Sequence, residues 1–226
     1  SAPRRNSTQV ARPVRVSLIA YAQDYFGAFA HAAEEAQRSV LIVGWDFHSR
    51  TRLHLEEALG APDLLGDFLN FLVKRRRGLE VHVLIWDYPM IFSKGRELSP
   101  IYGFGWRPRR RVHVCYDDHY PIGAAQHQKI VTIDGGAMAF CGGLDLTRSR
   151  WDTPEHKPYD PRRVNVGEDE SYAPFHDTMV AMDGEAARAL DEIARRRWQR
   201  AIRRPLPQVK PSVDVWPEKL PVTVKD

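Results

Sequence analysis

Short apolar runs alternate with helically periodic segments over the first part of the chain. Runs typical of strands buried between helices lie at 14–20, 40–45 and 79–87. Between them, residues 24–39 and 61–78 repeat apolar side chains at helical spacing, with Asp24 and Asp63 as expected N-caps. This order predicts an α/β fold, with a mixed central β-sheet flanked by helices.

The rest of the domain predicts more strands around one hairpin. Residues 88–110 are rich in Gly, Pro, Arg and aromatic residues, so we expect a long loop there. Two apolar runs flank Asp134-Gly135-Gly136, a pattern typical of a β-hairpin. We expect further strands at 111–117 and 176–184. A helix should follow at 185–204, acidic early and basic late, as its dipole favours.

The last segment differs in composition from the rest. Residues 205–226 are proline-rich and show little periodicity. We therefore expect one domain over 1–204 and a connector or wrap-around arm over 205–226.

Charge favours an anionic partner. The chain has 33 Lys and Arg against 29 Asp and Glu, a net charge of +4. Its arginine clusters suit either a phospholipid headgroup or nucleic acid. No apolar run approaches the roughly 20 residues of a membrane span, and the N-terminal stretch lacks the apolar core of a signal peptide. We expect a soluble or peripheral protein, and leave cytoplasmic and secreted locations open.

The most informative stretch places a lysine two residues after a histidine. His127 and Lys129 are expected on the strand before the hairpin, where such side chains share a face. A lysine charge is costly to bury, so the pair makes sense if both groups face an anion. A phosphodiester fits, because imidazole can attack phosphorus while ammonium offsets the oxygen charge. Asp134 lies an odd number of residues from His127 and Lys129, so on a strand it would face the other side. We expect it to hold the turn and orient its neighbours.

These residues carry a family resemblance. The segment HQKIVTID, followed by AFCGGLDLTRSRWDT, resembles the first His-x-Lys-x4-Asp motif of the phospholipase D superfamily and its continuation in two-motif phospholipases D. Similar family segments are PFHDTMVAMDGEAARALDEIARRRW, SVLIVGWDF and VDVWP. The resemblance covers nearly the whole chain. It implies a phospholipase D-like half, the N-terminal half of a two-motif enzyme.

The resemblance also implies roles for single residues. His127 matches the catalytic histidine, Lys129 the phosphate-binding lysine and Asp134 the supporting carboxylate of the motif. Asp177 matches a carboxylate that steadies a catalytic imidazole. The implied reaction is attack of a histidine on phosphorus, giving a phosphohistidine that water or an alcohol resolves.

Two further positions are candidate substrate contacts. Asp145 stands where many superfamily members have an Asn or Ser that contacts phosphate. An ionised Asp145 would repel phosphate, so we do not expect direct contact. His176 either lines the site or is a structural histidine.

The motif occurs once. No other histidine in the chain has a lysine two residues later. A second group must protonate the leaving alcohol, because the attacking imidazole cannot also do so. The missing half is either the C-terminal part of the same protein or a second copy in a homodimer. We favour the first, because the small single-motif nucleases lack the GGLDL continuation.

Three functions remain open from the sequence. The first is phospholipase D-type hydrolysis or phosphatidyl transfer on a phospholipid. The second is a nuclease-like phosphodiesterase acting as a homodimer, and the third is a non-catalytic phosphate-binding half. None needs a cofactor or metal, since lysine offsets the phosphate charge, and no ligand cluster has zinc-like spacing.

Overall fold

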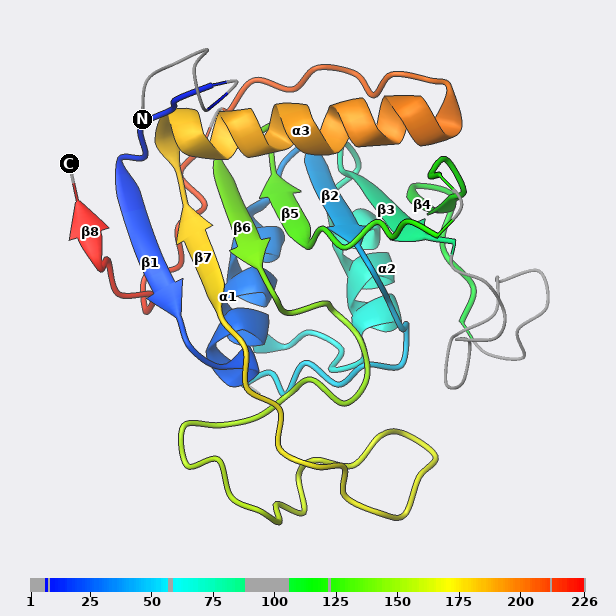
Figure 1. Cartoon of the computed structure of the whole chain (residues 1–226), viewed down its shortest axis with the longest axis vertical. Coiled ribbons are helices and arrows are strands. Elements are labelled where there is room, and N and C mark those ends of the chain that lie inside the picture. Colours follow the sequence, from blue (N-terminus) through cyan, green and yellow to red (C-terminus); the bar gives the residue numbers. More distant parts are fainter. Residues whose placement is uncertain are drawn as a thin grey trace.

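An eight-stranded mixed sheet forms the centre of the computed structural model, which describes residues 7, 9–56, 59–87, 106–121, 123–211 and 213–225. The strands are β1 (Arg15–Ile19), β2 (Ser39–Gly44), β3 (Glu80–Trp86), β4 (Val112–Asp117), β5 (Ile130–Ile133), β6 (Met138–Gly142), β7 (Met179–Met182) and β8 (Val224–Lys225). They lie side by side in the order β4-β3-β2-β5-β6-β7-β1-β8 (Figure 1). Residues 88–105 of the expected loop lie outside the described residues.

The strands change direction along the sheet. β2, β3 and β4 run parallel, and every other neighbouring pair is antiparallel. The predicted α/β fold with a mixed sheet is therefore confirmed. The β2 segment is apolar and fully buried, as a central strand covered on both faces must be.

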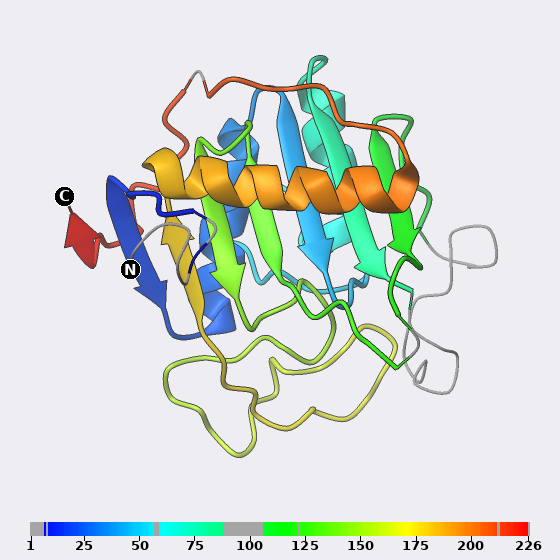
Figure 2. The same ribbon diagram turned by 45° about the horizontal axis from the view of Figure 1, so that its top comes forward.

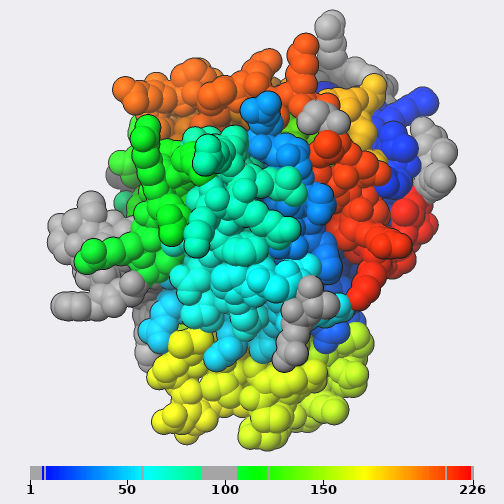
Figure 3. Space-filling model, turned by 180° about the vertical axis from the view of Figure 1, so that it is seen from behind, coloured from blue at the N-terminus to red at the C-terminus, as the bar shows by residue number. Residues whose placement is uncertain are grey.

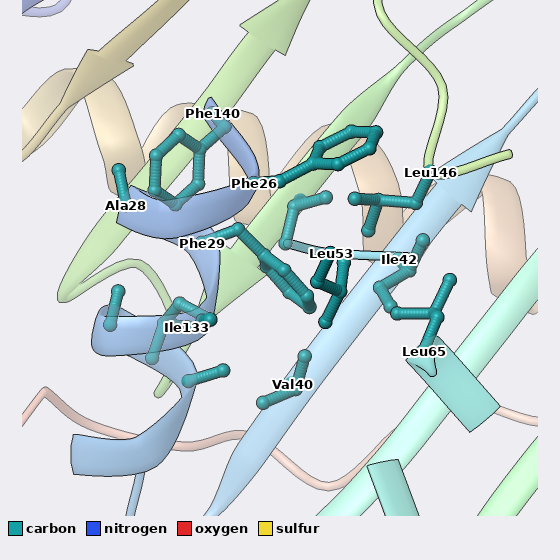
Figure 4. Close-up of a cluster of buried hydrophobic side chains, with 14 of the residues drawn as sticks. Phe26, Ala28, Phe29, Val40, Ile42, Leu53, Leu65, Ile133, Phe140 and Leu146 are labelled. Carbon is teal, nitrogen blue, oxygen red and sulfur yellow. The ribbon is translucent and has the colours of Figure 1, made fainter. Parts of the chain in front are cut away.

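Helices cover both faces of the sheet. The helices are α1 (Ala22–Glu35), α2 (Leu65–Arg75) and α3 (Gly184–Ile202). α1 and α2 lie on one face, and α3 crosses the other (Figures 1 and 2). Phe26 and Phe29 of α1 pack against Val40, Ile42 and Ile133 in the larger core (Figure 4). Trp198 of α3 anchors a smaller cluster on the opposite face, so each face has its own apolar core.

Some element boundaries differ from the sequence expectation. α1 begins at Ala22, which places Asp24 in its first turn rather than at the cap. α2 begins at Leu65, and the Asp63 carboxylate instead accepts the Leu55 N–H at 3.1 Å. β5 begins only at Ile130, which pairs with Val43 of β2, so His127 and Lys129 precede the strand on which they were expected.

The proline-rich segment lies on the domain rather than apart from it. Val215 is buried, and the Asp214 carboxylate receives two hydrogen bonds from the Arg15 guanidinium. β8 then pairs with β1 at the edge of the sheet. Figure 3 shows these last residues, in red, against the N-terminal segments in blue. The division at residue 204 stays a prediction.

Among the described residues, no helix combines the length and the apolar character that crossing a bilayer requires.

Candidate active site

The candidate residues converge at the edge of the sheet where the parallel strands end. β5 is antiparallel to β2, so its first residue, Ile130, lies beside Val43 near the carboxyl end of β2. β6 ends there, because Cys141 pairs with Ile130, and β7 starts there, because Met179 pairs with Gly142. Figure 1 shows these strand ends above the yellow-green segment that joins β6 to β7. The carboxyl ends of parallel strands are a common place for ligand sites.

His127 and Lys129 meet at one aromatic ring. Both precede β5, whereas the sequence pattern predicted them on that strand. The His127 ring is 6.0 Å from the Trp45 ring, centroid to centroid, and Lys129 Nζ is 5.7 Å from the Trp45 centroid. His127 is exposed, whereas Lys129 is 5% exposed. Both side chains therefore border the Trp45 ring; His127 is open to solvent and Lys129 is buried.

Lys129 forms a buried ion pair with Asp145. Lys129 Nζ lies 3.2 Å from Asp145 Oδ2, and Asp145 also accepts the Trp45 N–H at 2.9 Å. Burial raises the pKa of Asp145, although Lys129 and the backbone donors oppose the rise. Gly44 leaves room here, since a Cβ at that position would lie 3.0 Å from Asp145 Oδ1. The expectation that Asp145 makes no direct phosphate contact stays a prediction.

The ammonium of Lys129 has hydrogen-bonding capacity left over. Among the described residues, Nζ has its ion-pair partner but no hydrogen bond of good geometry. A cavity of about 10 Å³, enough for one water molecule, borders Lys129 and Asp145. An unused buried donor of this kind is costly unless an acceptor approaches it.

Asp177 lies directly over the Gly-Gly turn that follows β6. A Cβ on Gly143 would lie 2.1 Å from both carboxylate oxygens of Asp177. The half-buried carboxylate also accepts the Thr178 N–H at 2.7 Å. Among the described residues, no hydrogen bond joins Asp177 to His127, so its role in steadying that imidazole stays a prediction.

Asp134 lies at the other end of β5, away from this edge. It is 0% exposed and accepts the backbone N–H groups of Gln37, Arg38 and Ser39 at 2.7, 2.7 and 2.8 Å. These bonds fix the entry into β2. The structure therefore gives Asp134 a place where it can hold the turn and orient its neighbours, and does not bring it to His127.

His176 lies within a second group of rings. Its ring is exposed and is 5.1 Å from the Tyr21 ring and 5.9 Å from the His156 ring. His156 Nδ1 is 2.8 Å from Asp152 Oδ2, and Asp152 is buried. His176 thus borders Asp177 in sequence, while its ring contacts Tyr21, at the start of α1, and His156, in the segment between β6 and β7.

An arginine from α3 also contacts the segment that carries His127 and Lys129. Arg197 Nε donates to Asp117 at 2.9 Å, and its Nη1 donates to Gln128 at 3.4 Å. Gln128 separates His127 from Lys129, so its side chain points toward α3 while theirs do not. Burial lowers the pKa of Arg197, and Asp117 opposes that shift. The sequence showed only an arginine cluster here, and nothing in it singled out one buried member.

No family model matches the chain, but curated proteins do. Phospholipase D C of Dictyostelium discoideum is 26% identical over 201 residues, covering 78% of this chain and 12% of that protein. Phospholipase D gamma 1 of Arabidopsis thaliana is 28% identical over 211 residues, covering 76% of this chain and 24% of that protein. The mouse protein Phospholipase D1 is 29% identical over 157 residues, covering 65% and 14%.

Solved structures with a similar arrangement are more distant. NucT from Helicobacter pylori superposes with a TM-score of 0.45 at 14% identity, covering 84% of this chain and 96% of that one. A phosphatidylserine synthase from Haemophilus influenzae gives 0.46 at 8% identity, covering 81% and 36%. The chain spans a quarter or less of the first curated relatives it matches. Over most of its own length, this chain is therefore similar in sequence to proteins named phospholipase D.

Proposed function

We propose that this chain is one half-site of a phospholipase D-type phosphodiesterase that acts on phospholipids by hydrolysis or phosphatidyl transfer. One observation carries the proposal: the exposed imidazole of His127 and the donor-rich ammonium of Lys129 border the same Trp45 ring. A phosphodiester seated there would meet a nucleophile and a fixed cation together. The relationship to phospholipase D supports the choice of reaction.

The reaction needs a nucleophile and a separate acid. A free lone pair of one imidazole attacks phosphorus, forms a P–N bond and expels the headgroup alcohol. A second group protonates that alcohol as the P–O bond breaks. Water or another alcohol then displaces the histidine from phosphorus and loses a proton to the second group. The products are a phosphatidic acid or a new phosphatidyl ester.

Lys129 would stabilise the charge on the non-bridging oxygens. A positioned cation in a dry site is worth more than the same charge in water, because less solvent has to reorganise. Nζ is covered in the present arrangement, so its neighbours must shift slightly to admit an oxygen. Asp145 keeps the ammonium in place until then.

The group that protonates the leaving alcohol has to be a residue other than His127. The exposed position of His127 leaves its ring open to a group from another half. We propose that this half is either the C-terminal part of the same protein or a second copy of the chain. The net charge of +4 is compatible with a lipid or a nucleic acid phosphodiester.

The test compares substrates and concentrations. The chain is assayed for choline release from phosphatidylcholine micelles and for cleavage of single-stranded DNA. His127→Asn should abolish turnover, while His31→Asn on α1 should not change it. Specific activity that rises with chain concentration identifies the second copy as the missing half. No activity at any concentration, followed by activity when a second His-x-Lys-x4-Asp half is present, identifies the two-motif enzyme.

Other outcomes decide between the alternatives. DNA cleavage that depends on His127, with no lipid turnover, favours a nuclease-like enzyme. Binding of glycerophosphocholine without turnover, even with a second half present, indicates a binding module. Lipid turnover unaffected by His127→Asn contradicts the proposed chemistry.

A further inference from the structure

A second cluster of ligand-type side chains lies on the α3 face of the sheet. Glu80 and His82 are two residues apart on β3, and His113 is the direct partner of His82 on β4. All three side chains are half-buried, and their ligand atoms lie within 4.8 Å of one another. They belong to the face that packs on Trp198, because the His82 ring meets the Trp198 ring at 4.9 Å. They do not contribute to the His127 site.

The arrangement is already partly organised. The His82 and His113 rings stack at 4.7 Å with an interplanar angle of 14°, and His113 Nε2 lies 2.8 Å from Glu80 Oε2. Ligands of one zinc ion lie about 3 to 3.5 Å apart at usual bond lengths. Glu80 and His113 are 43% and 42% exposed at their side chains, so small rotations can close the remaining distance.

We propose that Glu80, His82 and His113 bind one borderline divalent transition-metal ion, of which Zn²⁺ is the test case. Two imidazoles and one carboxylate suit that class of ion better than they suit Mg²⁺ or Ca²⁺, which prefer oxygen ligands. Solvent completes the coordination, since the cluster is half open. A bound ion would tie the edge strand β4 to β3 through their side chains.

The surroundings are compatible with an added cation. Arg195, the nearby cation, is held by Asp191 and by the carbonyl oxygen of Pro207. Cys115 lies two residues after His113 on β4, but it does not belong to the group whose ligand atoms lie within 4.8 Å of one another, so we do not count it as a ligand.

The experiment measures zinc binding on the tag-free chain after removal of metal with a chelator. Isothermal titration with ZnCl₂ gives stoichiometry and affinity, and a thermal shift measurement gives a second readout. The wild-type chain should saturate at one equivalent and gain melting temperature with zinc. Glu80→Gln keeps the size of the side chain and should weaken binding at least tenfold. His113→Ala should weaken it further.

The control is His31→Gln, on the helix that covers the opposite face, which should bind zinc like the wild type. If Glu80→Gln no longer binds the one equivalent of zinc that the wild type binds, the site is supported, even if His113→Ala fails to fold. Absence of a saturable equivalent in the wild type overturns the proposal. Equal affinities of the wild type and Glu80→Gln overturn it as well. Neither result depends on phospholipid turnover, so the two proposals can fail separately.

Discussion

Lys129 Nζ and Asp145 Oδ2 lie 3.2 Å apart, with both side chains buried beneath the edge that carries His127. The same carboxylate accepts the backbone N–H of Trp45, whose ring borders His127. One carboxylate therefore fixes the cation and the aromatic neighbour of the imidazole. A cation held in place before substrate arrives needs little reorganisation during the reaction, which is the condition for strong electrostatic stabilisation.

Removal of the Asp145 charge should destabilise the fold. Asp145→Asn leaves Lys129 buried without its counter-charge, and breaking one partner of such a pair costs about 3 kcal/mol in the free energy of unfolding. Urea denaturation followed by circular dichroism measures the change. Lys219→Gln, which breaks the exposed pair with Glu56, serves as the matched control and should leave the denaturation midpoint unchanged. Equal stability of Asp145→Asn and wild type would contradict a tightly coupled pair.

Asp134 should matter for stability rather than for chemistry. Asp134→Asn replaces one acceptor oxygen by a donor group facing three backbone N–H groups, and should cost about 3 kcal/mol in the free energy of unfolding. Asp67→Asn, on the exposed first turn of α2, should change it by less than about 0.5 kcal/mol. Turnover per folded molecule should not change in Asp134→Asn. A shifted pH–rate profile would instead indicate contact with the reacting groups.

Gly143 should tolerate no side chain. Gly143→Ala places a methyl group 2.1 Å from the Asp177 oxygens, so either that carboxylate or the turn must move. We expect loss of stability and, in an active assembly, a fall in kcat. Gly27→Ala is the opposite case, because a Cβ there meets nothing within 4 Å, and the helix should gain about 1 kcal/mol. Wild-type stability of Gly143→Ala would show that Asp177 is not held over that turn.

Acid should destabilise the chain partly through His54. Burial lowers the pKa of His54 to about 4, below its ordinary value of 6.5. The unfolded chain therefore takes up a proton before the folded chain does, and the stability present above pH 6.5 falls as the pH drops toward 4. Through His54 alone, the free energy of unfolding should fall by about 2 kcal/mol between pH 7 and pH 5.

The matched variant for that prediction is His54→Asn. His54 has a φ of +53°, a left-handed conformation that asparagine adopts readily. Between pH 7 and pH 5, the free energy of unfolding of the variant, measured by urea denaturation, should fall by about 2 kcal/mol less than that of the wild type. Equal losses of stability in the two chains would contradict a neutral, half-buried His54. The Trp151 ring, stacked 4.0 Å from that of His54, gives a fluorescence signal for the same experiment.

Local pattern was enough to predict the sheet and the hairpin. The apolar runs gave β2 and β3, and Asp134-Gly135-Gly136 gave the turn between β5 and β6. The expected caps at Asp24 and Asp63 were wrong: Asp24 lies in the first turn of α1, and Asp63 accepts the Leu55 N–H instead of capping α2. Propensity cannot report such a competition between local and distant partners.

The sequence could name candidate residues for the site, but not the contacts that those residues make. Both His127 and Lys129 neighbour the Trp45 ring, as their spacing of two residues suggested, although β5 begins only at Ile130. The partner of Lys129 lies 16 residues along the chain in Asp145, and the Arg197 contact to Gln128 crosses 69 residues. Pairings of that separation depend on strand order, which no short pattern contains.

The central claim is that His127 and Lys129 face the same anion. The most direct measurement is an NMR titration of the chain, with labelled histidine and lysine side chains, by glycerophosphocholine. We predict that the His127 and Lys129 signals shift together with one dissociation constant, that Lys129→Met weakens the His127 response, and that His31 does not respond. Signals of His127 and Lys129 that stay fixed, or that move with different constants, would contradict the claim.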